Sequence, residues 1–448
     1  MSAETLNYKY NSLSSIKKEQ GKENLLLSKF NEVDKGSSPC FFWGKLNNPY
    51  ELSRCLITLS NTVQSSFNLS PFQLALLKDP IVTAGNNQIR FEGFSHCAGV
   101  YARVDVLDNG QDGEFIENGT TNVDFNTPLI SELGKIKKND DLILSVGQKE
   151  VGFHKGGESF IERKVPLPSK WIKGLTTVQH FFSESDYAQT LNRIQAIQLF
   201  KTIPNGKVKT DYFLIKRGSK YLFSPLKANN AVCIGGIHRL KLLQPLIPLI
   251  NELKVYPQKD MQSVTFILCF DELNFVFSIS RDFWRGFSGE GAALESLIED
   301  LPDSLIQAFD NYSFTNQEFN PALMSFEEGI DISKIEKLST KLSAMGLLGY
   351  DLAKNGFFYR RLPFKLDRIM SLNPRLKGAE KLLEDNKVNI TLKNDNEIEA
   401  KVEGSGVQHY VVIKGDLQKC TCTWFSKNQG ERGACKHILA VKKKAKAN

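Results

Sequence analysis

A tight group of cysteine and histidine residues near the C-terminus constrains the fold of this chain more than any other feature. In the segment KCTCTWFSKNQGERGACKHILAV (419–441), a Cys-x-Cys pair is followed, after twelve residues, by Cys-x-His. Alternate residues of a strand point to the same side, so Cys420 and Cys422 can direct two sulfur atoms at one point. The pattern therefore predicts two convergent pairs of metal ligands.

The chain between the two pairs supports this interpretation. Gly430 and Gly433 predict a turn that reverses its direction, and HILAVKKKAKA (437–447) is typical of a helix. Thiolate and imidazole ligands suit zinc, whereas magnesium and calcium prefer oxygen. We therefore expect a ββα unit that holds one structural Zn²⁺ ion in a closed tetrahedral site. Its predicted ligands are Cys420, Cys422, Cys435 and His437.

The other cysteines indicate a reduced protein. They are scattered singly among apolar residues, which is typical of buried thiols and not of a disulfide framework. The N-terminus has no signal pattern, and no apolar run is long enough for a membrane helix. We therefore expect a cytoplasmic protein without a membrane-bound part.

The positive charge is concentrated at one end. The chain has a formal net charge of +7, and the whole of this excess lies in residues 419–448, where Glu431 is the only acid. A basic segment of this kind is typical of phosphate contacts. Lysines at the end of a helix also stabilise its dipole, so both explanations stay open.

The length of the chain predicts several domains, and its mixture of strand-like and helix-like hydrophobic patterns predicts an α+β fold. The expected division is a mobile tail at 1–38, an α+β body at 39–330, a module at 331–386, and a small sheet with the zinc finger and basic tail at 387–448. The module at 331–386 is either a linking helical subdomain or winged-helix-like.

Periodicity predicts the individual elements. Strands are expected at 100–107 and 142–147, in the hairpin-like GFFYRRLPF (356–364), and in VNITL, EIEAKVEG and HYVVIKG. Helices are expected at 50–65, 71–77, 187–202, 238–253, 292–309, 332–345 and 374–386.

The ligand spacing resembles the SWIM zinc finger family, and the resemblance extends into the body. Several segments are similar to bacterial SWIM zinc finger proteins of the kind encoded beside a MoxR-type AAA+ ATPase and a von Willebrand factor A-domain protein: CAGVYARVDVL, GTTNVDFN, LSVG, ERKVPLPSKWIKGL, RGFSGEGAALESLIEDLP and FFYRRLPFKLDRI. The resemblance implies zinc ligation, a protein partner such as that ATPase or A-domain protein, and no assigned catalytic residue.

Two residues could in principle serve as nucleophiles, and both are better explained otherwise. Ser288 lies in GFSGE (286–290), where Glu290 replaces the small residue that a nucleophile elbow requires. Cys97 could pair with a histidine, but a buried cysteine in a sheet is the expected role. We therefore predict that the chain has no catalytic residues.

Other polar groups have two explanations each. Arg360 and Arg361, beside aromatic residues, could clamp a nucleic acid or form the solvated face of a strand. Asp124 lies in a segment that could be a recognition loop or a tight turn. His409, eleven residues before the first zinc ligand, could support the metal site.

The preferred hypothesis for function is a non-enzymatic adaptor that binds a protein partner. The alternative is DNA binding through the basic finger and tail, and the third is a hydrolase activity hidden in the body. The two leading hypotheses differ in how they should respond to nuclease and to salt.

Overall fold

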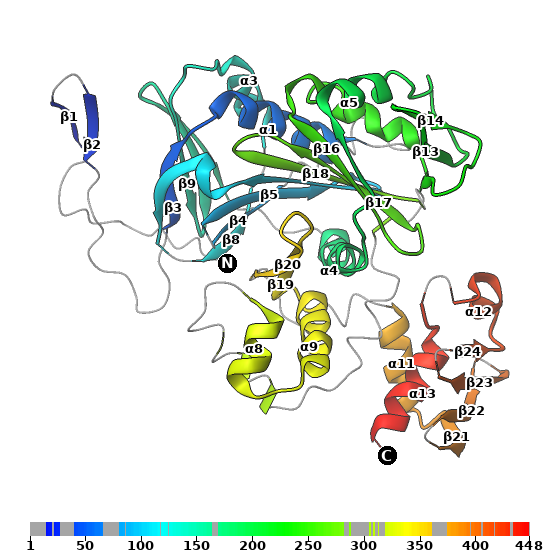
Figure 1. The fold of residues 1–448 in the computed structure, drawn as a ribbon. Helices are drawn as coiled ribbons and strands as arrows, with labels where there is room; N and C mark the ends of the chain where they lie inside the picture. Colours follow the sequence, from blue (N-terminus) through cyan, green and yellow to red (C-terminus); the bar gives the residue numbers. More distant parts are fainter. Residues whose placement is uncertain are drawn as a thin grey trace.

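The computed structural model has a mixed α+β fold, as the sequence predicts (Figure 1). It describes residues 15–19, 22–26, 40–65, 80–85, 87–116, 118–123, 125–163, 169–281, 286–287, 304–305, 308–309, 312, 319–360, 374–394, 396–404, 406–415, 417–430 and 433–447. Among the described helices, none combines the length and the apolar character that crossing a bilayer requires.

An eight-stranded antiparallel sheet forms the centre of the body. Its strand order is β12-β16-β17-β18-β6-β5-β4-β8. The strands are β4 (Ile81–Gly85), β5 (Gln88–Phe94), β6 (Val100–Val106), β8 (Gly119–Asn122), β12 (Gln189–Asn192), β16 (Glu252–Pro257), β17 (Ser263–Cys269) and β18 (Leu273–Ser280).

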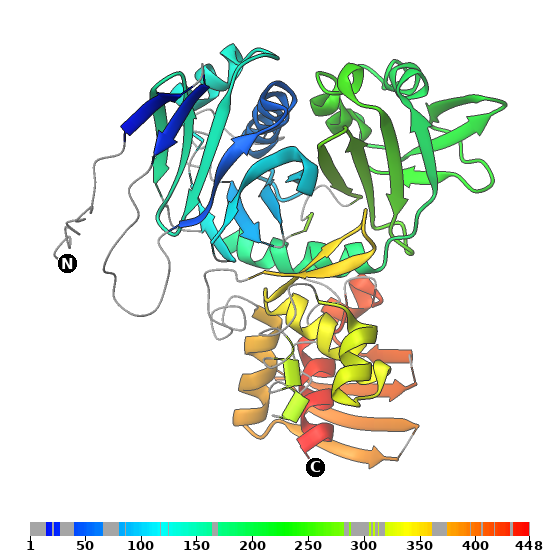
Figure 2. The same ribbon diagram turned by 60° about the vertical axis from the view of Figure 1, so that its left-hand side comes forward.

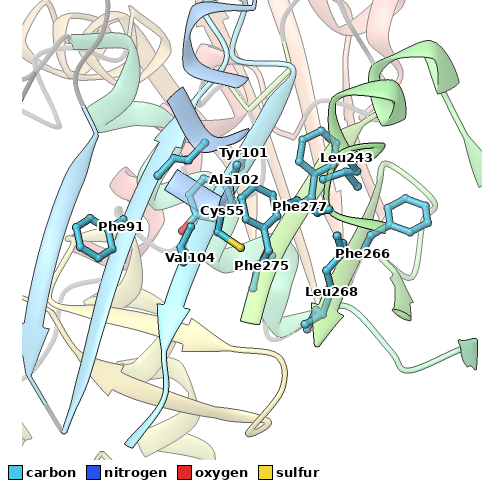
Figure 3. Close-up of a cluster of buried hydrophobic side chains, with 14 of the residues drawn as sticks. Cys55, Phe91, Tyr101, Ala102, Val104, Leu243, Phe266, Leu268, Phe275 and Phe277 are labelled. Atoms are coloured by element: carbon cyan, nitrogen blue, oxygen red, sulfur yellow. The ribbon is translucent and has the colours of Figure 1, made fainter. Parts of the chain in front are cut away.

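The two faces of this sheet differ in chemistry. Helix α1 (Pro49–Gln64) packs against β5 and β6, and its Cys55 is buried among apolar residues of this face, which continues across β18 and β17 (Figure 3). The alternate residues of β5 and β6 are polar and are nevertheless buried: Gln88, Arg90, Glu92, Tyr101, Arg103 and Asp105. This polar face lies beneath helix α4 (Ser169–Ser183) and a hairpin from the C-terminal half of the chain.

Two smaller sheets complete the body. The first has the order β11-β10-β9-β3-β7, and the second has the order β14-β13-β15. Helix α3 (Thr127–Lys135) packs against α1, and α5 (Arg193–Phe200) packs against β14. The strands are β3 (Cys40–Leu46), β7 (Gln111–Phe115), β9 (Leu142–Gly147), β10 (Glu150–Lys155), β11 (Glu158–Arg163), β13 (Tyr212–Arg217), β14 (Lys220–Ser224) and β15 (Val232–Ile234).

A helical region follows the body. Helices α8 (Pro321–Glu328) and α9 (Ile332–Ala344) pack together around Met324, Ile335 and Leu338. The hairpin of β19 (Leu348–Asp351) and β20 (Gly356–Tyr359) follows, and it reaches the body (Figure 1). Strand β19 is buried and only the tip of the hairpin at 353–355 is exposed, whereas a DNA-binding wing must be exposed along its length.

The C-terminal module has a core of its own. A four-stranded antiparallel sheet of order β21-β22-β23-β24 carries α13 on one face, and α11 packs against α13 (Figure 2). Its elements are α11 (Pro374–Glu384), β21 (Val388–Lys393), β22 (Glu397–Glu403), β23 (Gln408–Lys414), β24 (Leu417–Cys420), α12 (Thr423–Asn428) and α13 (Lys436–Ala447). Helix α11, which the sequence analysis grouped with residues 331–386, shares this core with the finger.

Two of the predicted helices in the body differ from the structure. The helix expected at 238–253 is wrong: short 3₁₀ turns at Ile237–Leu243 and Ile247–Leu249 replace it, because Pro245 and Pro248 interrupt α-helical hydrogen bonding. The helix expected at 187–202 is partly wrong, since strand β12 precedes α5 and Asn192 forms a capping box at the start of α5.

Other predictions are confirmed or lie outside the described residues. Strand β9 and helices α1, α9 and α11 are found where periodicity predicts them. The helix expected at 71–77 lies outside the described residues, as does most of the one expected at 292–309. Within the expected tail at 1–38, strands β1 (Ser15–Glu19) and β2 (Lys22–Leu26) form a hairpin.

Candidate metal centre

The four predicted ligands meet in the core of the C-terminal module. The ligand atoms of Cys420, Cys422, Cys435 and His437 all lie within 4.8 Å of one another, and all four residues are buried. Cys420 ends β24, while Cys435 and His437 lie at the start of α13. Residues from both ends of the segment therefore meet at one point, as the spacing predicts.

The local geometry around Cys422 differs from the expectation. The chain leaves the sheet after Cys420, and Cys422 is the N-cap of helix α12. Its Sγ accepts a hydrogen bond from the backbone N–H of Phe425 at 3.4 Å. The prediction that both thiols share one strand is therefore wrong for Cys422, but the cap still directs its sulfur into the cluster.

Glycine residues allow the chain to return. Helix α12 ends at Gln429 in a left-handed conformation, and Gly430 and Gly433 also have positive φ angles of 87° and 74°. The N–H of Gly433 donates to the carbonyl of Gly430 at 2.9 Å. The turn predicted from the two glycines is confirmed, and it leads directly to Cys435.

The donor atoms fit a tetrahedral zinc site. The Sγ atom of Cys420 lies 3.8 Å from Nδ1 of His437. Zinc–sulfur bonds of about 2.3 Å and zinc–nitrogen bonds of about 2.1 Å at tetrahedral angles place such atoms about 3.6 Å apart. The observed separation agrees, and it identifies Nδ1 as the histidine atom on the side of the sulfur ligands.

The thiols also influence one another electrostatically. A hydrogen bond from Cys420 lowers the pKa of Cys435 to about 4 against the opposing effect of burial, and His437 adds to the lowering. The same hydrogen bond and burial raise the pKa of Cys420, while burial is the main cause of the raised pKa of Cys422. Without a metal, the three thiols cannot all be deprotonated easily, since one thiolate raises the pKa of its neighbours. A divalent cation offsets this repulsion, because it stabilises all the thiolates together.

Two residues from neighbouring elements support the ligands. The ring of His409, on β23, packs on the ring of His437 with centroids 4.4 Å apart. Burial and the neighbouring His437 lower the pKa of His409. His409 therefore covers the histidine ligand through ring packing. This position beside the metal site agrees with the supporting role predicted for it from the sequence.

The second supporting residue, Arg375 of α11, was not predicted from the sequence. Its Nη1 donates to the carbonyl of Ala434 at 2.8 Å, immediately before Cys435. Its guanidinium also stacks over the ring of Trp424 at 4.6 Å. Arg375 thus links α11 to the chain on both sides of the glycine turn, at Trp424 and at Ala434. No sequence motif around Arg375 predicts these contacts.

The lysines of the C-terminal helix have partners within the module. Lys443 Nζ lies 3.3 Å from a carboxylate oxygen of Glu380, and Lys444 Nζ donates to the carbonyl of Val388 at 2.5 Å. In turn, Lys393 donates to the carbonyl of Ala445 at 2.6 Å. These contacts attach α13 to α11 and β21, so part of the basic charge has a structural role.

Of the alternative candidates, the structure describes only Cys97 and Arg360, and neither has its predicted surroundings. Cys97 lies half-buried in the turn between β5 and β6, 3.4 Å from the hydroxyl of Ser95, so its expected place within a sheet is wrong. Arg360 is buried and pairs with Glu92, which overturns both of its predicted roles. Ser288, Asp124 and Arg361 lie outside the described residues.

Comparison with known proteins assigns the finger. Residues 410–446 match the SWIM zinc finger family, so the chain carries a SWIM zinc finger at its C-terminal end. The match and the four-residue cluster together support one structural zinc ion. No curated protein matches the chain.

Solved structures give a distant likeness only. Proliferating cell nuclear antigen from Entamoeba histolytica is 12% identical, with a TM-score of 0.37, over 54% of this chain and 98% of that one. The PCNA2–PCNA3 complex from Sulfolobus tokodaii is 9% identical, with a TM-score of 0.39, over 54% of this chain and 99% of that one. Both scores are too low to establish a shared fold.

Proposed function

We propose that this protein is a non-enzymatic adaptor whose zinc-stabilised C-terminal module binds a protein partner. The partners that the sequence resemblance implies are a MoxR-type AAA+ ATPase and a von Willebrand factor A-domain protein. The proposal rests mainly on the chemistry of one exposed surface, the face of the C-terminal sheet that points away from α11 and α13.

The metal centre itself supports a structural role. Four protein ligands complete a tetrahedral zinc sphere, whereas catalytic zinc keeps one position for water or substrate. All four ligands are buried, with His437 only 3% exposed. The zinc ion is therefore suited to hold the sheet and helices together, and the surface around it is what a partner can meet.

The outer face of the sheet combines apolar and charged groups. Tyr410 on β23 and Leu417 on β24 are 52% and 53% exposed. Lys401 lies 5.7 Å from the ring of Tyr410, and the register places both on the same face of the sheet. Exposed aromatic residues surrounded by polar groups are typical of the anchors of protein interfaces.

The charges on this face favour a protein over a nucleic acid. Lysines and glutamates occur there in equal numbers: Lys401, Lys414, Lys419, Glu397, Glu399 and Glu403. A phosphate backbone would be repelled by the glutamates, whereas a protein surface of mixed charge can complement both signs. Because Lys443 and Lys444 also have partners within the module, the DNA-binding alternative is the weaker one.

A capture experiment tests the proposal. Zinc-loaded protein is immobilised and offered purified MoxR-type ATPase, purified A-domain protein, or duplex DNA, with and without nuclease. We expect nuclease-resistant capture of one protein. Changing Tyr410→Ser with Leu417→Ser should weaken it about 30-fold or more, because a central aromatic anchor contributes about 2 kcal/mol. Ile194→Ser, at a residue of α5 that is 66% exposed, is the matched control.

A salt titration separates the DNA-binding alternative. If the tail contacts phosphates, changing Lys442, Lys443, Lys444 and Lys446 to Gln should flatten the log–log salt dependence on duplex DNA by about 3 to 4 units. For an adaptor, the same change should leave protein capture nearly unaltered. Tight DNA binding that persists at high salt, together with no protein capture, would replace the proposal with the alternative.

A further inference from the structure

Six charged residues are buried between the body and the β19–β20 hairpin, far from the zinc site. They are the three arginines and three carboxylates Arg90, Glu92, Arg103, Asp105, Asp351 and Arg360, referred to below as the six-charge cluster. Each is at most 5% exposed, and their formal charges cancel. A cluster of this kind is unusual, because arginine, aspartate and glutamate are almost never fully buried unless they are paired.

The cluster has contacts that join the body to the hairpin and others that lie within the body, where Asp105 pairs with both Arg90 and Arg103. Arg360 Nη2 lies 2.7 Å from Glu92 Oε2, which also accepts a hydrogen bond from the hydroxyl of Tyr101. Arg90 Nη2 lies 3.5 Å from Asp351 Oδ2, and Arg103 donates to the carbonyl of Tyr350 at 3.1 Å. Within the body, Arg103 Nε lies 2.8 Å from Asp105.

The hairpin has two chemically distinct faces. Asp351 and Phe358 face the six-charge cluster, and the ring of Phe358 lies 3.8 Å beneath the guanidinium of Arg90. On the other face, Leu348 belongs to the core formed with α9, and Tyr359 packs against it. The hairpin is therefore attached to the helices by apolar packing, whereas its attachment to the body combines apolar packing with charged contacts.

The apolar contacts of the hairpin and its charged contacts differ in the free energy that their separation requires. Apolar surfaces lose free energy of burial when they separate, whereas separated charges recover their hydration. Recovery is favourable for Arg360, whose Nε and Nη1 are buried without a hydrogen-bond acceptor among the described residues. The hairpin also contributes Tyr350 and Leu352 to the body core, so the attachment is not purely ionic.

We propose that the β19–β20 hairpin is a releasable latch. The six-charge cluster fixes it in one position on the body, and it opens along its charged face while α8 and α9 stay attached to it, a movement that also releases the packing of α9 and β19 on α4. The backbone N–H of Tyr350 also donates a hydrogen bond to Oε1 of Gln179 on α4 at 2.6 Å, which adds to the attachment of the hairpin to the body. Opening of the latch would let the zinc module change its position relative to the body.

Hydrogen exchange on the full-length zinc-loaded protein tests the latch. Arg360→Glu places two carboxylates together and should raise exchange in 348–359 about a hundredfold, since an unpaired buried charge is strongly unfavourable. Strands β17 and β18 should keep their protection. Reversing the pair with Glu92→Arg and Arg360→Glu should restore most of the protection. Lys354→Glu, on the exposed tip of the same hairpin, is the control and should change nothing.

Two outcomes would overturn the latch. In the first, Arg360→Glu accelerates exchange in β17 and β18 as much as in the hairpin, so that the hairpin is part of one cooperative core. The second applies even if that variant does not fold: in the wild-type protein, a low concentration of urea should open the hairpin before β18. Equal exchange of hairpin and β18 at every urea concentration would exclude a separate opening.

Discussion

The zinc cluster and the six-charge cluster hold small elements in place by different means. In the finger, four ligands from a short stretch of chain surround one point, and every ligand atom lies within 4.8 Å of the others. At the hairpin, the charges come from residues as far apart in the chain as Arg90 and Arg360, and they pair with one another across a contact between two regions. The finger should therefore depend on an added ion, whereas the hairpin depends on the fold around it.

The zinc finger and the hairpin also differ in what happens when their stabilising groups are lost. Structural zinc contributes a large part of the folding free energy of a small module, so its loss unfolds that module. A buried ion pair contributes little net stability, although removal of one partner is costly. The finger is thus expected to be either metal-bound or unfolded, while the hairpin is expected to be either docked or released.

The largest effect is expected from removal of a zinc ligand. Cys422→Ser should abolish zinc binding and unfold the module at 374–447, since structural zinc contributes about 10–16 kcal/mol in small fingers. Elemental analysis and hydrogen exchange measure the two effects. The six-charge cluster should keep its protection, because it needs no metal.

The matched control for that variant is Cys97→Ser, which replaces a half-buried thiol outside the cluster. It should leave the zinc content at one ion per chain. If Cys422→Ser retained zinc, the ligand assignment would be wrong. If it unfolded the body as well, the independence of the two regions would be wrong.

An intermediate effect is expected from loss of one buried charge. Glu92→Gln keeps the acceptor for Tyr101 but leaves Arg360 unpaired, and it should destabilise the fold by about 3–5 kcal/mol. Adding Arg360→Met, which removes the second charge, should recover most of this loss. Denaturant unfolding of the variants measures both changes.

An exposed pair in the finger module gives the comparison for this test. Glu380→Gln removes the partner of Lys443, and both side chains of that pair are partly exposed. It should cost no more than about 1 kcal/mol, because water screens such pairs. An equal cost for Glu92→Gln and Glu380→Gln would contradict the special role given to the six-charge cluster.

Among the changes at the two clusters, the smallest effect is expected at Arg375, the residue that supports the zinc ligands from α11. Arg375→Ala removes the hydrogen bond to Ala434 and the stacking on Trp424, and it should weaken zinc affinity about 10–100-fold without abolishing it. Competition with a chromophoric chelator measures the affinity. Lys377→Ala, on the exposed side of α11, should leave the affinity unchanged.

The zinc site was predictable because its information is local. Cys-x-Cys and Cys-x-His each place two ligands within reach of one ion, whatever the rest of the fold does. Cys422 caps helix α12 and does not lie on a strand as predicted, yet the ligand set does not depend on that detail. Periodicity was similarly sufficient for α1, where the apolar positions lie on one side of the helix.

The sequence by itself therefore determined the four zinc ligands and the small sheet beside them, but not that α11 belongs to the same module. Only the tertiary structure decided that Arg375 supports the finger and that Arg360 is buried against Glu92. In β5 and β6, alternation shows that Arg90, Glu92 and Arg103 share a face, and such a face is normally in water. Alternation cannot tell what covers a face, because a distant segment such as the hairpin reaches it only in the folded chain.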